Sequence, residues 1–230
     1  MKRHYKHPLY EYPSTEYDIA VIELGRRIEY DFDKFGDSPA CMDKSGLDII
    51  SKTATVQGKG VTEVGEVGSL LETNVTVISN ELCSEIINYN GTLNKAIKRN
   101  IDRHLPKGLD GSFLCAQGIV TDDGVFPGSC KGDSGAPLTL HDDMGKQTLI
   151  GVVSGGVGCG KGIPNWYSKV SLYYPWIDCV IQTSRDNKGN VDIVREKCDK
   201  VALDLVPPCI SPEDLLFADD IDLRLPLCEN

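Results

Sequence analysis

Residues 128–137 read Gly128-Ser129-Cys130-Lys131-Gly132-Asp133-Ser134-Gly135-Ala136-Pro137 and predict a tight turn that presents one hydroxyl. Glycine lies on both sides of the Asp-Ser pair, and glycine adopts backbone conformations that a Cβ forbids. The glycines also let a carbonyl group approach the amides of Gly132 and Ser134, and two such amides can stabilise an oxyanion. The stretch predicts Ser134 as a nucleophile. A surface turn that happens to contain Asp-Ser is the alternative.

The composition is that of an ordinary globular protein. The chain has 230 residues, of which 40 % are hydrophobic, enough to bury one or two cores. Short runs rich in Val and Ile recur between turn-forming residues, whereas long runs of helical period are scarce, which predicts an all-β barrel or sandwich. The net charge of −10 argues against nucleic-acid binding, and no apolar window is long enough to span a membrane.

The nine cysteines indicate an oxidising compartment. Their scattered spacings favour a disulfide framework over a zinc site, and no metal or cofactor is expected. Disulfides imply secretion, yet Met1-Lys2-Arg3-His4 is followed by no apolar run of the kind that a signal peptide needs. We therefore expect the sequence to begin part-way into a longer secreted precursor.

Several motifs in unbroken order resemble the chymotrypsin-like (trypsin-fold) serine proteases, over roughly residues 5 to 182. The resemblance implies an all-β fold of two antiparallel Greek-key β-barrels, the first incomplete, with a C-terminal helix and a cysteine-containing tail. Besides the nucleophile segment, the matching stretches are His7-Pro8-Leu9-Tyr10, Asp18-Ile19-Ala20-Val21-Ile22-Glu23-Leu24, Pro39-Ala40-Cys41, Phe113-Leu114-Cys115-Ala116, residues 148–159, Pro164-Asn165-Trp166-Tyr167-Ser168-Lys169-Val170 and Tyr174-Pro175-Trp176-Ile177.

The resemblance also implies a division of the chain. The expected segments are a remnant of the first barrel with the triad aspartate (1–40), an inter-barrel linker (41–53), the second barrel with nucleophile and specificity pocket (54–182) and an acidic, cysteine-containing extension (183–230). We expect the extension to pack on the second barrel through disulfides, with a detachable interaction module as the alternative. Two bridges can form in any of three pairings among Cys179, Cys198, Cys209 and Cys228.

The roles around the nucleophile follow from the same resemblance. Asp18 is implied as the triad aspartate, which holds a histidine in the right tautomer while Ser134 attacks a peptide carbonyl. The amides of Gly132 and Ser134 are implied as the oxyanion hole. Asp133 is implied as the partner of the α-amino group that activation cleavage releases. A peptide or protein is therefore the expected substrate.

The expected specificity pocket differs from that of the trypsin branch. Gly128 stands where that branch has an aspartate, which disfavours cleavage after Lys or Arg. An open entrance at Gly156 suggests a bulky apolar residue before the scissile bond, but Asn165 would narrow or polarise the pocket. Gly155 replaces the usual tryptophan beside the substrate strand. The pocket residues implied by the resemblance are Gly128, Ser154, Gly156 and Asn165.

Other cysteines and two sequons complete the expectations. The resemblance pairs Cys83 with Cys115 and Cys130 with Cys159. It also implies that Cys41 ties the domain to a propeptide that lies outside this sequence. Asn74 and Asn90 begin N-glycosylation sequons. Asn90 is the preferred carrier because residues 84–112 are expected to form a long surface loop with a helical piece.

The triad histidine is missing from its expected motif. The family carries it in a Thr-Ala-Ala-His-Cys type sequence upstream of the aspartate, and none of His4, His7, His104 and His141 lies in such a motif. Without a base the Ser134 hydroxyl stays weakly nucleophilic, and we expect a loss of about 10⁶-fold in turnover. We expect a serine endopeptidase whose triad histidine and the motif around it are missing from this sequence. A catalytically inactive, secreted homologue that binds partners is the alternative.

Overall fold

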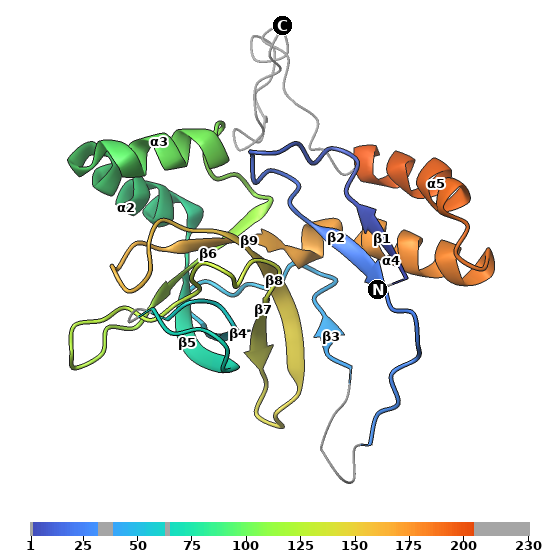
Figure 1. The fold of residues 1–230 in the computed structure, drawn as a ribbon, viewed down its shortest axis with the longest axis horizontal. Helices are drawn as coiled ribbons and strands as arrows, with labels where there is room; N and C mark the ends of the chain where they lie inside the picture. The colour runs from blue at the N-terminus through green and yellow to red at the C-terminus, as the bar shows by residue number, and fades with distance from the viewer. Residues whose placement is uncertain (1, 32–38, 63–64, 205–230) are drawn as a thin grey trace, which may run out of the picture.

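The computed structural model describes residues 2–31, 39–62 and 65–204 (Figure 1). The strands are β1 (Arg3–Lys6), β2 (Ala20–Glu23), β3 (Cys41–Met42), β4 (Thr53–Gly58), β5 (Leu71–Ile78), β6 (Phe113–Gly118), β7 (Pro137–His141), β8 (Gln147–Gly155) and β9 (Asn165–Lys169). The helices are α2 (Asn80–Leu93), α3 (Lys95–His104), α4 (Val170–Asp186) and α5 (Val191–Asp204).

Strands β4 to β9 form a closed antiparallel barrel. The order in the sheet is β3-β8-β7-β4-β5-β6-β9, and a further pairing of β8 with β9 closes the ring, while the short β3 adds to β8 in parallel. Apolar side chains fill the interior, and those of Val77, Leu138 and Ile150 are fully buried. The predicted antiparallel β-barrel followed by a C-terminal helix is confirmed.

The N-terminal strands form a separate two-stranded sheet. Strand β1 pairs with β2 in antiparallel register, from Arg3 opposite Glu23 to Lys6 opposite Ala20. In Figure 1 this sheet lies beside α4 and α5. Its Tyr5 and the neighbouring Ile19 share one buried cluster with residues of both helices. The N-terminal segment is therefore anchored on the C-terminal helices.

Helix α5 is fastened to α4 by a disulfide between Cys179 and Cys198. This is one of the pairs that the sequence left open. Both Cys198 and Val194 of α5 are buried in the cluster that α4 supports. Cys209 and Cys228 lie outside the described residues. The first part of the expected extension thus packs as a helix on the C-terminal helix of the domain.

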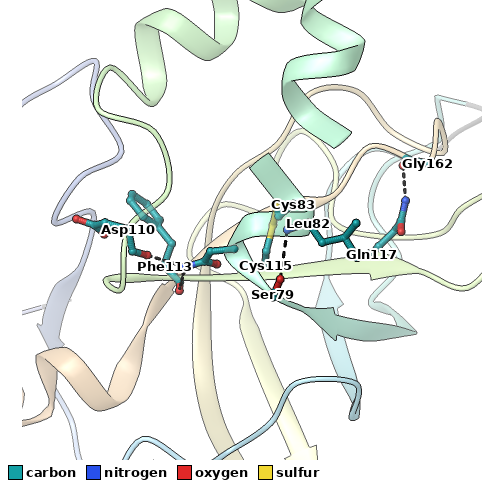
Figure 2. The surroundings of a disulfide bond; sticks show 9 residues. Ser79, Leu82, Cys83, Asp110, Phe113, Cys115, Gln117 and Gly162 are labelled. Atoms are coloured by element: carbon teal, nitrogen blue, oxygen red, sulfur yellow. Dashed lines mark hydrogen bonds between the residues drawn. A yellow bond between two sulfur atoms is a disulfide. The ribbon is translucent and has the colours of Figure 1, made fainter. Parts of the chain in front are cut away.

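Residues 84–112 were expected to form a long surface loop with a helical piece; the helical part is larger than expected, because α2 and α3 occupy most of this segment. Ser79 caps α2 by accepting a hydrogen bond from the Leu82 amide, and Asn94 caps α3 in the same way. The disulfide of Cys83 with Cys115 ties α2 to β6 (Figure 2). The many Asn and Lys residues made the narrow apolar face of these helices difficult to recognise in the sequence. A narrow apolar face is sufficient here because caps and a disulfide also stabilise the helices.

The helical fold of this segment also changes the setting of Asn90. The residue lies within α2, and its side-chain amide donates to the Ile86 carbonyl at 2.8 Å. Asn74 is exposed on β5, where its side chain accepts a hydrogen bond from Thr55. The preference for Asn90 rested on a loop that the structure replaces by a helix.

Candidate active site

The segment around Ser134 is a tight turn held at several points. The Asp133 amide donates to the Cys130 carbonyl, and the Gly135 amide donates to the Val153 carbonyl of β8 at 2.9 Å. Gly132 and Gly135 have φ angles of +99° and +85°, which side chains with a Cβ rarely adopt. The turn is bonded to the chain beyond β8 by the disulfide of Cys130 with Cys159. Ser134 is exposed at its tip.

The Asp133 carboxylate is held by two backbone amides. One oxygen accepts from the Gly60 amide at 2.6 Å and the other from the Cys130 amide at 2.9 Å. A Cβ added at Gly58 would lie 2.0 Å from the Asp133 Oδ1, so this carboxylate needs glycine opposite it. The salt bridges among the described residues do not include Asp133. Its pairing with an α-amino group stays a prediction.

Asp18 lies against the ends of two barrel strands. Its carboxylate accepts a hydrogen bond from the Ser154 hydroxyl at 2.8 Å, and its backbone carbonyl accepts one from the Ser168 hydroxyl at 2.6 Å. Burial raises the pKa of the Asp18 carboxyl, and the Ser154 hydrogen bond works in the opposite direction. Two strands of the barrel thus fix the orientation of this carboxyl group.

A cavity of about 300 Å³ lies between the Ser134 turn and the end of β8. Ser154 lines it together with Ser134, so the residue that bonds Asp18 and the proposed nucleophile face one space. Gly156 and Asn165 line the same cavity. Gly128 lines a neighbouring one instead, beside Asp133. Three of the four expected pocket residues therefore meet, and Ser154 has a further contact that its place in the sequence did not indicate.

Helix α3 contributes two side chains that the sequence analysis missed. Asn100 and His104 line the cavity opposite β8. Asn100 was not considered, and His104 was considered only as a triad base, because the segment was expected to be mostly loop. The His104 Nδ1 pairs with the Pro13 carbonyl at 2.8 Å, and the His104 carbonyl accepts from Thr15. These bonds attach α3 to the loop before Asp18.

No hydrogen bond among the described residues joins a histidine to Asp18 or Ser134. His7 is fully buried between Tyr17, Tyr173 and Trp176, and burial lowers its pKa to about 4. His141 contacts Thr139. Within this part of the chain, Ser134 lines the cavity, while the Asp18 carboxylate is connected to it through the hydrogen bond from Ser154.

Trp166 of β9 lies close to Gly155, which stands where the family has a tryptophan. A Cβ added to Gly155 would lie 2.5 Å from the Trp166 indole, which leaves no room for a side chain. The indole is 1 % exposed and donates to the Thr15 hydroxyl at 3.1 Å. Trp166 thus takes up space beside Gly155 and also supports the loop that leads to Asp18.

The family model described as Trypsin matches residues 1–177. The chain belongs to the trypsin family. The match to the trypsin family ends within α4, so the last turns of this helix and all of α5 lie beyond it.

Several curated proteins resemble this trypsin-family chain. It is 31 % identical over 174 residues to "Serine proteinase stubble" of Drosophila melanogaster, covering 74 % of the chain and 20 % of that protein. It is 30 % identical over 191 residues to "CLIP domain-containing serine protease C9" of Anopheles gambiae, covering 81 % and 51 %. "Inactive CLIP domain-containing serine protease A28" of the same mosquito is 27 % identical over 174 residues, covering 75 % and 41 %. The chain thus spans between 20 % and 51 % of the length of these relatives.

The helices offer one further observation. In residues 2–31, 39–62 and 65–204, no helix combines the length and the apolar character needed to cross a membrane.

Proposed function

We propose that this trypsin-family domain hydrolyses peptide bonds through an acyl-enzyme, with Ser134 as the nucleophile and Asp18 orienting an imidazole base. The observation that carries the proposal is the hydrogen bond of Ser154 to Asp18, because Ser154 lines the cavity that Ser134 also lines. The glycine backbone around Ser134 supports an oxyanion hole formed by the amides of Gly132 and Ser134.

Acyl transfer by this arrangement needs a base, and no described histidine forms a hydrogen bond with Asp18 or Ser134. His104 lines the cavity, but its Nδ1 pairs with the Pro13 carbonyl. The Asp18 carboxylate can orient a histidine and stabilise its charged form. Its hydrogen bond from Ser154 does not by itself give it access to the proton of the Ser134 hydroxyl. The chain by itself should therefore react slowly, and its proposed role as an endopeptidase depends on an imidazole being supplied.

A second candidate function is that of an inactive homologue which binds peptides or partner proteins in the same cleft. Two observations favour it: no described histidine bonds Asp18 or Ser134, and a relative at 27 % identity is named inactive. The retained contacts of Asp18 and Asp133 favour the enzyme, because binding alone does not require either carboxylate to be oriented.

The setting of the domain is proposed to be extracellular. The three disulfides of the described residues are stable in an oxidising compartment. Cys41 is exposed and free at the start of β3, and we propose that it bonds a propeptide. We place any glycan at Asn74, which is exposed, rather than at Asn90, whose amide is bonded within α2.

Labelling of Ser134 by a fluorophosphonate probe tests the proposed chemistry. The full chain should react slowly, and added imidazole should speed the reaction by about tenfold, below the 10²–10⁴-fold of a positioned base. Ser134→Ala should not label, and Asp18→Asn should lose most of the gain from imidazole. If mass spectrometry finds no adduct on Ser134 with imidazole present, the inactive homologue is the better description.

A further inference from the structure

The side chain of Asn165 lies between two glycines of the proposed specificity pocket. A Cβ added to Gly156 would lie 2.0 Å from the Asn165 Nδ2, and one added to Gly128 would lie 2.8 Å from its Oδ1. The amide therefore reaches from one glycine to the other and lies where any side chain at either position would have to go. This placement explains why Gly128 faces a different cavity from Gly156.

The Asn165 side chain has no hydrogen-bond partner among the described residues. The residue is 9 % exposed, and its side-chain nitrogen and oxygen take no part in the hydrogen bonds of the described residues. It lines the cavity that contains Ser134 and Ser154. Neither amide atom is among the fully buried polar atoms without a partner, so both are accessible from the cavity. An unpaired amide at a cavity wall is thus a group that a ligand can satisfy.

We propose that Asn165 selects peptides with a carboxamide side chain, Gln or Asn, at the residue before the scissile bond. The inference deepens the proposed function, because it rests on a peptide lying in the same cleft. An amide offers a donor and an acceptor, and a second amide complements both. The carboxamide preference replaces the preference for a bulky apolar residue that was expected from the open entrance at Gly156. An apolar side chain would leave the Asn165 amide unpaired.

Charged side chains fit this pocket less well than a carboxamide. The cavity lining holds no carboxylate among the described residues, so a Lys or Arg side chain would lose water without an opposite charge. An Asp or Glu side chain in the cavity would lie against the Asn165 amide, which carries no charge. Lys131 is the charged residue of the lining, and it is exposed at the turn. An exposed ammonium group compensates little for the desolvation of a buried carboxylate.

Peptide binding to the full chain tests this preference without requiring catalysis. The probes are N-acetylated, C-terminally amidated Ala-Ala-Pro-Xaa-Ala peptides with Gln, Asn, Phe, Lys or Glu as Xaa. Titration followed by ¹⁵N NMR should show Gln or Asn bound about tenfold more tightly than Phe, the size of one or two net hydrogen bonds. The side-chain ¹⁵N resonance of Asn165 should shift with these peptides only.

Two variants of Asn165 separate hydrogen bonding from pocket size. Asn165→Asp keeps the shape and removes the donor, so the carboxamide preference should fall about tenfold and Lys peptides should gain. Asn165→Gly removes the amide and should make Phe the best-bound residue. Both variants need an unfolding midpoint close to that of the parent chain, and Asn74→Asp, on exposed β5, serves as the control with unchanged binding.

The outcomes distinguish this inference from the proposed enzyme. Tighter binding of Phe than Gln by the parent chain, an unchanged preference in Asn165→Asp, or no binding of any peptide would overturn the inference. Labelling of Ser134 without a carboxamide preference would leave the enzyme in place and remove this specificity. A carboxamide preference without labelling would support the pocket and remove the enzyme.

Discussion

The barrel of β4–β9 and the β1–β2 sheet carry the two halves of the proposed site, but they are stabilised differently. The barrel closes on itself and has its own core, in which Val77 and Leu138 are fully buried. The β1–β2 sheet has one pairing and relies on α4 and α5, where Tyr5 packs near Trp176 and Val194. The Ser134 turn therefore depends on the barrel, whereas the position of Asp18 depends on the C-terminal helices as well.

This difference shows where the site is vulnerable. The hydrogen bonds from Ser154 and Ser168 are the links from Asp18 to the barrel. Loss of packing on α4 should release the segment that carries Asp18 while the Ser134 turn keeps its disulfide and backbone bonds. Substitutions on each side can test whether the two halves respond separately.

The largest effect is expected for Trp176→Ala. Trp176 is 1 % exposed on α4 and contacts His7 by its ring edge. Truncation should cost about 3–5 kcal/mol of unfolding free energy. Urea denaturation measures the total, and hydrogen exchange should show that β1 and β2 lose protection before β7. Leu138→Ala in the barrel core is the matched control and should lower protection on both sides. The same pattern of hydrogen-exchange protection in the two variants would contradict the view that the β1–β2 sheet and the barrel are stabilised differently.

Removal of the Cys179–Cys198 disulfide comes next. The bond closes a loop of sequence separation 19, and opening it should cost about 3 kcal/mol through the greater freedom of the unfolded chain. We expect the double change to Ala to lower the urea midpoint and to expose the amides of α5 first. The bond between Cys83 and Cys115 is the control, because its removal should act on α2 instead. Loss of α2 protection in the first variant would argue against separate halves.

Acidification should weaken the N-terminal half through His7. Burial lowers its pKa from 6.5 to about 4, so the unfolded chain takes up a proton at higher pH than the folded one. The contribution of the neutral His7 side chain to the unfolding free energy is fully present above pH 6.5 and is lost as the pH falls towards 4. Between pH 7.5 and pH 5 the loss should be about 2 kcal/mol. His7→Phe keeps an aromatic ring against Tyr17 and should show a flatter pH profile. Parallel profiles for the two proteins would rule out this origin.

The smallest effect is expected for Ser154→Ala. The change removes the hydroxyl that bonds the Asp18 carboxylate and should cost about 1 kcal/mol. It should also raise the pKa of Asp18 further, because burial already raises it and the opposing hydrogen bond is lost. Titration of the Asp18 carboxyl ¹³C resonance measures this shift. Ser168→Ala, which removes a bond to the Asp18 backbone carbonyl, should leave that titration nearly unchanged. An equal shift in both variants would indicate a general loosening.

Some of the fold could be predicted because its information is local. The glycines around Ser134 indicate a tight turn by themselves, and alternation in the Val- and Ile-rich runs indicates strands. Only a helical piece of residues 84–112 was expected, and the full extent of α2 and α3 could not be recognised. Their stability comes from the Ser79 and Asn94 caps, a disulfide and a few buried side chains. Most residues of α3 are polar, so its sequence contains no wide apolar stripe of helical period.

The amino-acid sequence alone determined the turn around Ser134, the barrel class and the family to which its motifs point. Only the tertiary structure decided that Ser154 bonds Asp18, since 136 residues separate the two. It also decided that the Asn165 amide fills the space between Gly128 and Gly156. The physical reason is that turns and strands follow from neighbours along the chain, whereas the direction of a buried polar group is set by strands that meet only when the barrel closes.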